Sequence, residues 1–134
     1  MESHIIEVRV RYQETDGQGI VHHGNYLNYF EKARIEYLRA MGISYRDVEE
    51  AGLMLVVAKV EVNYFSPAYF DDLLQIETRV TSTKGAAIVH EYEIIRDGDV
   101  VVQGLTRVGC LTKSGKVTRV RKWLGGRGDF QLPG

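Results

Sequence analysis

The sequence has few of the features that mark extracellular or membrane proteins. Among its 134 residues there is one cysteine, Cys110, which cannot form an intramolecular disulfide, so nothing points to an oxidising compartment. No apolar run approaches the roughly 20 residues of a membrane-spanning helix. The first residues lack the basic start and apolar run of a signal peptide. We therefore expect a soluble, cytoplasmic protein with no membrane insertion.

An excess of charge of one sign is also missing. Seventeen basic and eighteen acidic side chains give a formal charge of −1. This balance argues against a nucleic-acid-binding domain, although it leaves room for a local basic patch facing a small phosphorylated ligand. The chain has neither a P-loop nor a G-x-G-x-x-G motif, so nucleotide hydrolysis and dinucleotide redox chemistry are not indicated. We predict no cofactor.

Two other kinds of reactive site find little support. His22 and His23 are potential metal ligands, but adjacent side chains rarely converge on one ion, so we predict no metal site. Cys110 lies in a strand-like run over residues 104–112, with no helix terminus or basic neighbour to activate its thiol. We interpret Cys110 as a small buried hydrophobic residue.

The first part of the chain predicts a strand, a loop and a long helix. Apolar and charged residues alternate over 5–12, which is typical of a half-buried strand, and the polar segment 13–24 is rich in glycine. The helix should follow, with Asn25 as its N-cap and Gly42 just past its end. Its apolar stripe recurs at steps of three or four residues: Tyr26, Phe30, Ala33, Tyr37 and Met41.

The remainder predicts one short helix and then only strands. Ser44 and Asp47 resemble a capping box, and Gly52 ends this second helix. Alternating patterns then cover residues 58–64, 74–80, 88–94 and about 100–112. One long helix against one antiparallel sheet is an α+β fold, whose edge strands a second subunit could pair. We expect one domain over 1–124 and a flexible tail over 125–134.

Asp16 is the first candidate for chemistry. It lies in the glycine-rich loop that leads directly into the N-terminus of the long helix, where backbone N–H groups lack acceptors and the helix dipole is positive. Such a site suits a carbonyl oxygen that becomes negative during acyl transfer. A nearby carboxylate can activate water or attack the carbonyl. The alternative is that Asp16 is only a turn residue that bonds local backbone.

The segment 12–34 contains a long motif without gaps: Thr15-Asp16, Gly19-Ile20-Val21, His23, Asn25-Tyr26, Phe30, Glu31 and Ala33-Arg34. This motif resembles the active-site signature of the 4-hydroxybenzoyl-CoA thioesterase branch of hotdog proteins, including the acyl-CoA thioesterases associated with the Tol-Pal system. A weaker likeness extends through Asn63-Tyr64 and Ser66-Pro67 to about Trp123.

This resemblance implies a hotdog fold, in which an antiparallel sheet wraps one long helix. It implies hydrolysis of acyl-CoA to a free acid and coenzyme A, with Asp16 as nucleophile or general base. It also implies that the backbone N–H of His23 polarises the thioester carbonyl. Family members form homodimers that pair their sheets edge to edge, often assembled further into dimer-of-dimers tetramers.

Further residues are candidates for substrate binding. We assign Gly24, Tyr26 and Asn63 to this role, although Tyr26 also fits the helix core and Asn63 fits a solvated strand. The phosphates of coenzyme A require cations, for which Lys84, Arg119, Arg121 and Lys122 are the candidates. Taken individually, each of them is better interpreted as an ordinary solvated surface charge.

Alternatives from other classes remain open. Glu31 is a second carboxylate, and a different hotdog branch uses a helix acid catalytically. With Asp16 present, we interpret Glu31 as structural, either positioning loop backbone or pairing with Arg34. A hotdog protein could instead bind acyl-CoA or acyl carrier protein without turnover, although a pure binder has no need of a carboxylate at Asp16. The Thr15-Asp16 turn does not match hotdog dehydratases. The acyl group itself cannot be deduced from these residues.

Overall fold

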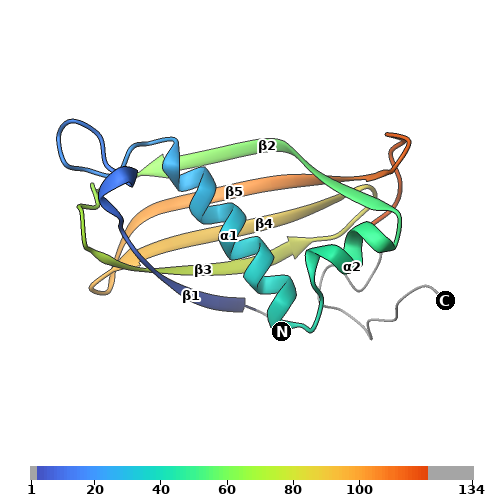
Figure 1. The fold of residues 1–134 in the computed structure, drawn as a ribbon, viewed down its shortest axis with the longest axis horizontal. Helices are drawn as coiled ribbons and strands as arrows, with labels where there is room; N and C mark the ends of the chain where they lie inside the picture. The colour runs from blue at the N-terminus through green and yellow to red at the C-terminus, as the bar shows by residue number, and fades with distance from the viewer. Residues whose placement is uncertain (1–2, 121–134) are drawn as a thin grey trace.

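A five-stranded antiparallel sheet curves around one long helix, α1 (Asn25–Ala40) (Figure 1). The computed structural model describes residues 3–120. The strand order is β1-β3-β4-β5-β2, so β1 and β2 are the edges. The strands are β1 (Ser3–Arg9), β2 (Leu53–Tyr64), β3 (Leu73–Ser82), β4 (Ala87–Arg96) and β5 (Asp99–Thr112). A 3-10 turn, η1 (Tyr12–Glu14), follows β1, and a short helix, α2 (Tyr45–Glu50), follows α1.

The predicted α+β hotdog architecture is therefore confirmed, and the differences from prediction lie at element ends. The first strand stops at Arg9, because Glu14 Oε1 accepts the Arg11 N–H at 2.8 Å and folds the chain into η1. The strand predicted to begin at residue 58 begins at Leu53. Its first residues are almost all apolar, so they lack the alternation of apolar and polar residues on which the prediction depended. The predicted tail, residues 125–134, lies outside the described residues.

The start of α1 corrects one prediction. Gly24, not Asn25, is the N-cap, and it supplies no side-chain cap. The Asn25 N–H already donates to the His22 carbonyl at 2.9 Å, and the Asn25 amide oxygen accepts from the Asn28 side chain at 3.0 Å. At the other end Gly42 adopts φ +84, a left-handed conformation open to glycine, which confirms the predicted stop.

The short helix α2 begins as predicted. Ser44 is its N-cap, and its hydroxyl accepts the Asp47 N–H at 3.1 Å. The Asp47 carboxylate returns a bond from the Ser44 N–H at 2.8 Å. This reciprocal pair is a capping box, which satisfies two helix-end donors locally and is therefore readable from sequence alone.

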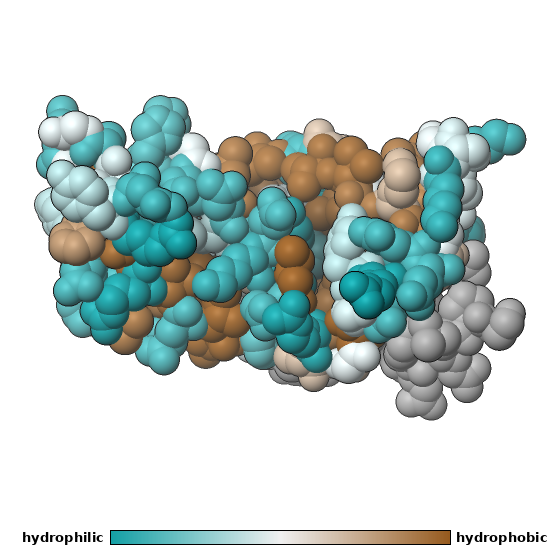
Figure 2. Space-filling view, viewed as in Figure 1, coloured by the Kyte–Doolittle hydropathy of each residue, from teal (hydrophilic) through white to brown (hydrophobic). Residues whose placement is uncertain are grey.

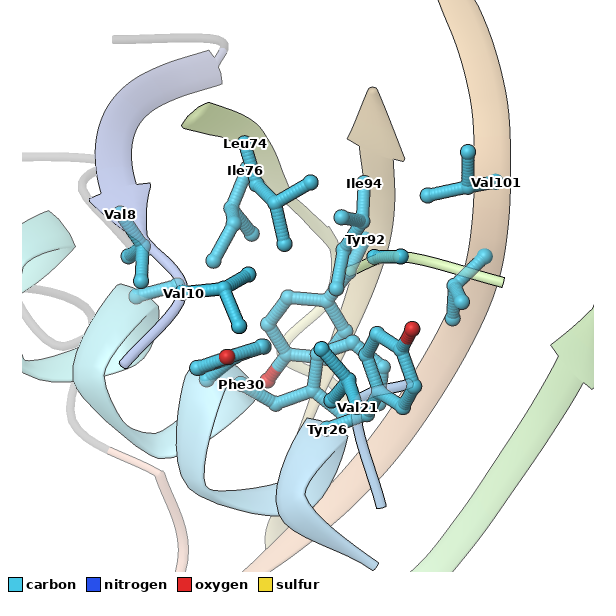
Figure 3. Packing of buried hydrophobic residues seen from close by; sticks show 14 residues of the cluster. Val8, Val10, Val21, Tyr26, Phe30, Leu74, Ile76, Tyr92, Ile94 and Val101 are labelled. Atoms are coloured by element: carbon cyan, nitrogen blue, oxygen red, sulfur yellow. The ribbon is translucent and has the colours of Figure 1, made fainter. Parts of the chain in front are cut away.

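The apolar stripe of α1 packs on the concave face of the sheet (Figure 3). Phe30 is fully buried, and its ring stacks on Tyr92 at a centroid distance of 4.3 Å. Gly104 on β5 lies directly under the Phe30 ring. The stripe is wider than predicted, since Tyr29 is also buried, while Met41 is only partly so.

Two further properties of the fold bear on the sequence predictions. Cys110 is fully buried in β5, which confirms its reading as a core residue. Within residues 3–120, no helix combines the length and the apolar character that crossing a membrane requires.

Candidate active site

A short loop holds Asp16 beside the start of α1. The loop closes on itself through a Thr15–Val21 bridge and through the Asp16 N–H, which donates to the Ile20 carbonyl at 2.8 Å. Gly19 makes this tight return with φ +80, a conformation that glycine adopts without strain. Ile20 also bridges to Tyr69 in the connection between β2 and β3, so the loop is anchored to the sheet.

Only one oxygen of the Asp16 carboxylate forms a hydrogen bond within the loop. Oδ1 accepts the Gln18 N–H at 2.8 Å, as the turn-residue alternative anticipates. Oδ2 has no hydrogen-bond partner among residues 3–120, and the side chain is partly exposed. The local bond thus orients the carboxylate and leaves its second oxygen for other chemistry.

Asp16 lines a cleft of about 320 Å³ at this end of the molecule. One wall comes from the loop and the helix start, and the other from the end of β2 and the segment after it. The lining residues are Asp16, Ile20, Val21, His23, Tyr26, Tyr64, Phe65, Ser66 and Pro67. The structure therefore brings together three of the predicted site residues: Asp16, His23 and Tyr26.

The backbone just before α1 presents an unengaged donor in this cleft. The N–H of His23 has no acceptor among the described residues, whereas its carbonyl accepts the Tyr64 hydroxyl at 3.0 Å. The next N–H, of Gly24, is taken by His22 Nδ1 at 3.1 Å, and Gly24 does not line the cleft. The His22 and His23 rings stack at 4.2 Å. Of the two N–H groups, only that of His23 is left for a ligand.

Tyr26 forms a neutral wall of the cleft. Its side chain is buried and packs edge-on against Tyr64 at a centroid distance of 5.6 Å. Burial raises the pKa of the Tyr26 hydroxyl to about 12, so the phenol is uncharged at neutral pH. Tyr26 therefore adds shape and apolar surface to the site and no charge.

Asn63, Lys84 and Arg119 lie away from this cleft in the protomer. Asn63 precedes Tyr64, so strand alternation turns it toward a polar depression on the other face of the sheet, lined also by Glu61 and Gln103. Lys84 follows β3, at the end of that strand away from the Asp16 loop, about 30 Å along a ten-residue strand.

Arg119 lies near Lys84, because the next residue, Val120, donates its N–H to the carbonyl of Gly85 at 2.9 Å. Arg121 lies outside the described residues. Within one protomer, therefore, Lys84 and Arg119 do not share the cleft of Asp16.

Glu31 lines a separate cavity, and Arg34 donates to the Tyr92 hydroxyl at 3.2 Å instead of pairing with Glu31. Sequence reasoning missed Tyr64 and Phe65 as cleft residues. The Asn63-Tyr64 and Ser66-Pro67 pairs were matched to the family pattern, but strand pairing alone places this segment against the helix start.

The chain has clear relatives among known proteins. Residues 10–127 match the family model of the thioesterase-like superfamily. The acyl-CoA thioesterase YbgC of Haemophilus influenzae is 39% identical over 105 residues, which are 78% of this chain and 77% of that one. The structure of DHNA-CoA thioesterase from Staphylococcus aureus superimposes with a TM-score of 0.84 at 33% identity, covering 89% of this chain and 81% of that one.

A more distant structure shares the fold. A mutant of 4-hydroxybenzoyl-CoA thioesterase in complex with 4-hydroxybenzoyl-CoA superimposes with a TM-score of 0.84 at 20% identity, over 92% of this chain and 96% of that one. With the family match over most of the chain, these similarities confirm the predicted hotdog fold and enzyme class. The chain belongs to the thioesterase-like superfamily.

Proposed function

We propose that this protein hydrolyses acyl-CoA thioesters, with Asp16 as the catalytic carboxylate and the His23 N–H as an oxyanion donor. One observation carries the proposal: a carboxylate oxygen and a backbone N–H, both without partners in the described chain, line the same cleft at a helix N-terminus. The name of the H. influenzae relative, an acyl-CoA thioesterase, supports the substrate class.

The geometry supports a reaction in which the thioester oxygen lies against the His23 N–H. Negative charge that develops on this oxygen is stabilised by the N–H and by the positive end of the α1 dipole. If Asp16 acts as a general base, it takes a proton from water, the water oxygen bonds to the acyl carbon, and the C–S bond breaks to release the coenzyme A thiol. If it acts as nucleophile, its oxygen displaces the thiolate and water then cleaves the mixed anhydride.

The test is release of free thiol by the purified protein from a panel of acyl-CoAs. The panel combines aliphatic chains of several lengths with 4-hydroxybenzoyl-CoA and 1,4-dihydroxy-2-naphthoyl-CoA, and includes acyl carrier protein thioesters as a second carrier. Turnover would support the proposal, and the preferred member would identify the acyl class. Binding of acyl-CoA by calorimetry without any turnover would instead support a non-catalytic binding protein.

The oxyanion role belongs to the backbone of His23, so its side chain should matter little. His23→Ala keeps the N–H and should therefore avoid the roughly hundredfold or greater loss of kcat that removal of an oxyanion donor brings. The kcat of this variant toward the best acyl-CoA, with His22→Ala as the companion variant, measures this. A hundredfold loss confined to His23→Ala would assign the chemistry to the imidazole instead.

We further propose that the protein acts as a dimer that pairs β2 with its copy. Among residues 3–120, β2 is an edge strand of twelve residues, and apolar side chains gather along it (Figure 2). An exposed, apolar edge strand is a surface that a second chain covers by antiparallel pairing. The exposed apolar residues of β2 are Met54, Val56, Val57, Val60 and Tyr64.

Charging this edge should separate the subunits. We expect the double variant Val56→Lys and Val60→Lys to shift the mass in solution from dimer or tetramer to monomer, and to lower activity with it. Ile5→Lys is the control, since it places a lysine on the opposite edge, β1, at an apolar position that is more exposed than Val56 or Val60. Light scattering after size exclusion gives the mass, and an unchanged mass for the double variant would contradict the proposal.

The same dimer would explain the basic residues that lie far from Asp16. Antiparallel pairing of β2 with its copy places the Leu53 end of one strand beside the Tyr64 end of the other. Tyr64 lines the cleft, whereas Lys84 and Arg119 lie at the sheet end where β2 begins. We propose that these cations contact the coenzyme A phosphates bound at the partner's cleft. Arg121, beyond the described residues, remains a candidate for the same role.

A further inference from the structure

A second cavity, of about 420 Å³, lies along α1 and is lined by none of the residues of the Asp16 cleft. It extends between the later turns of α1 and strands β2, β4 and β5. Six of its lining residues are apolar: Ile35, Leu38, Leu55, Val57, Ile88 and Val108. A mostly apolar cavity with a few convergent polar groups is the usual form of a small-molecule site.

Arg34 brings a positive charge to this cavity without a counter-ion. Its guanidinium donates to one neutral group, the Tyr92 hydroxyl, at 3.2 Å. No carboxylate of residues 3–120 lies within ion-pair distance of it, although Glu31 also lines the cavity with an exposed side chain. A guanidinium carries five N–H donors, and a half-buried cation is costly unless it is paired. Most of the donors of Arg34 are therefore left for a ligand.

His90 is a second unsatisfied group of the same cavity. Its side chain is only 5% exposed, and Nδ1 has no hydrogen-bond partner within the described chain. Burial, together with the nearby positive charge of Arg34, lowers the pKa of His90 to about 3, so its ring is neutral. A neutral imidazole carries one donor and one acceptor nitrogen. It therefore lies beside the guanidinium without adding charge.

We propose that this cavity binds an acyl group that ends in a carboxylate, with the carboxylate against Arg34 and His90. A carboxylate matches the fork of a guanidinium and would supply the missing counter-ion, whereas a hydroxyl would leave the charge unpaired. The apolar walls would cover the methylene chain. The inference rests on the proposed thioesterase function and names its substrate class: thioesters of dicarboxylic acids.

The acyl chain length of the preferred substrate depends on the distance between the cavity and the Asp16 cleft that holds the thioester, which lies either in the same subunit or in its partner. Along a single α1, Arg34 lies eleven residues after His23, or about 16 Å at 1.5 Å per residue. In an edge-paired dimer the cleft of the partner could feed the same cavity over a different distance. The test therefore scans chain length in matched pairs that differ only in the terminal group: butyryl and succinyl, hexanoyl and adipyl, octanoyl and suberyl, decanoyl and sebacyl thioesters of coenzyme A.

We expect kcat/KM for the dicarboxylic member to exceed that of its monocarboxylic match at least tenfold at one or more lengths. Arg34→Gln, which keeps an N–H donor near Tyr92 but removes the charge, should abolish this preference while leaving hydrolysis of the monocarboxylic member within a few-fold. Arg39→Gln is the matched control, because Arg39 lies on the exposed face of α1 and pairs with Glu36 at 2.8 Å. It should leave the preference unchanged.

The outcomes separate this inference from the proposed function. Hydrolysis of the monocarboxylic thioesters with no dicarboxylic preference at any length would overturn the inference and leave the thioesterase intact. A preference that survives in Arg34→Gln would overturn it as well. If no thioester is hydrolysed, calorimetry of free suberate and octanoate decides: binding of suberate alone, lost in Arg34→Gln, would support the site without the enzyme, and equal or absent binding would overturn it.

Discussion

Asp16→Asn is expected to lower kcat for acyl-CoA hydrolysis at least about a hundredfold, the usual scale for loss of a general acid or base. Asparagine has the same size but neither takes up a proton from water nor attacks a thioester. Its amide oxygen can still accept the Gln18 N–H, which Asp16 Oδ1 accepts at 2.8 Å, so the loop should keep its shape. Thiol release at saturating acyl-CoA measures the effect.

Two controls decide whether a loss of activity comes from the chemistry. The thermal unfolding midpoint of Asp16→Asn should equal that of the wild type, because the carboxylate is partly exposed and its local bond is retained. Asp97→Asn makes the same change in the turn between β4 and β5, at a left-handed position that asparagine accepts, and should keep activity. Full activity of Asp16→Asn would remove Asp16 from the mechanism.

Gly104→Ala is expected to produce the largest loss of stability for the smallest change in the chain. The added Cβ would collide with Cζ of Phe30 and lie 2.6 Å from Cε2 of the same ring. The ring cannot move aside easily, since it is fully buried and stacked on Tyr92, whose hydroxyl is in turn bonded to Thr106 at 2.6 Å. We expect a loss at or above the upper end of the usual 1–3 kcal/mol for overpacking, measured as the free energy of unfolding in urea.

A control on the same strand and a rescue on α1 test this explanation. Gly109→Ala places its Cβ no closer than 3.6 Å to the Val56 carbonyl, an ordinary contact, and should cost much less. Phe30→Leu removes the ring atoms that clash, so the double variant with Gly104→Ala should be more stable than the sum of the two single losses implies. Strict additivity, or an equal loss in Gly109→Ala, would show that the close approach of Phe30 is not the cause.

Local patterns in the sequence determined the helices, their ends and the loop that contains Asp16. The stripe of α1, the capping box of Ser44 and Asp47, and the stop at Gly42 depend on residues three or four positions apart. Residues at this spacing are neighbours in any helix, so the helix and its ends can be predicted without knowledge of the tertiary structure. The position of Asp16 beside the helix start could be predicted for the same reason, because the loop and the helix that follows it are contiguous in the chain. The prediction of Asn25 as N-cap was wrong by one residue. The Asn25 N–H bonds to the His22 carbonyl in the preceding turn, and the helix therefore begins at Asn25 itself.

Contacts between distant segments were decided only by the tertiary structure. Tyr64 reaches the His23 carbonyl across 41 positions, and Arg34 reaches Tyr92 across 58. Neither contact has a local signature, because each depends on strand register and on how the helix lies across the sheet. The same register sends Asn63 to the opposite face from Tyr64 and sets Lys84 at the far end of β3. The sequence therefore determined which groups can do chemistry, and the pairing of the strands decided which of them meet.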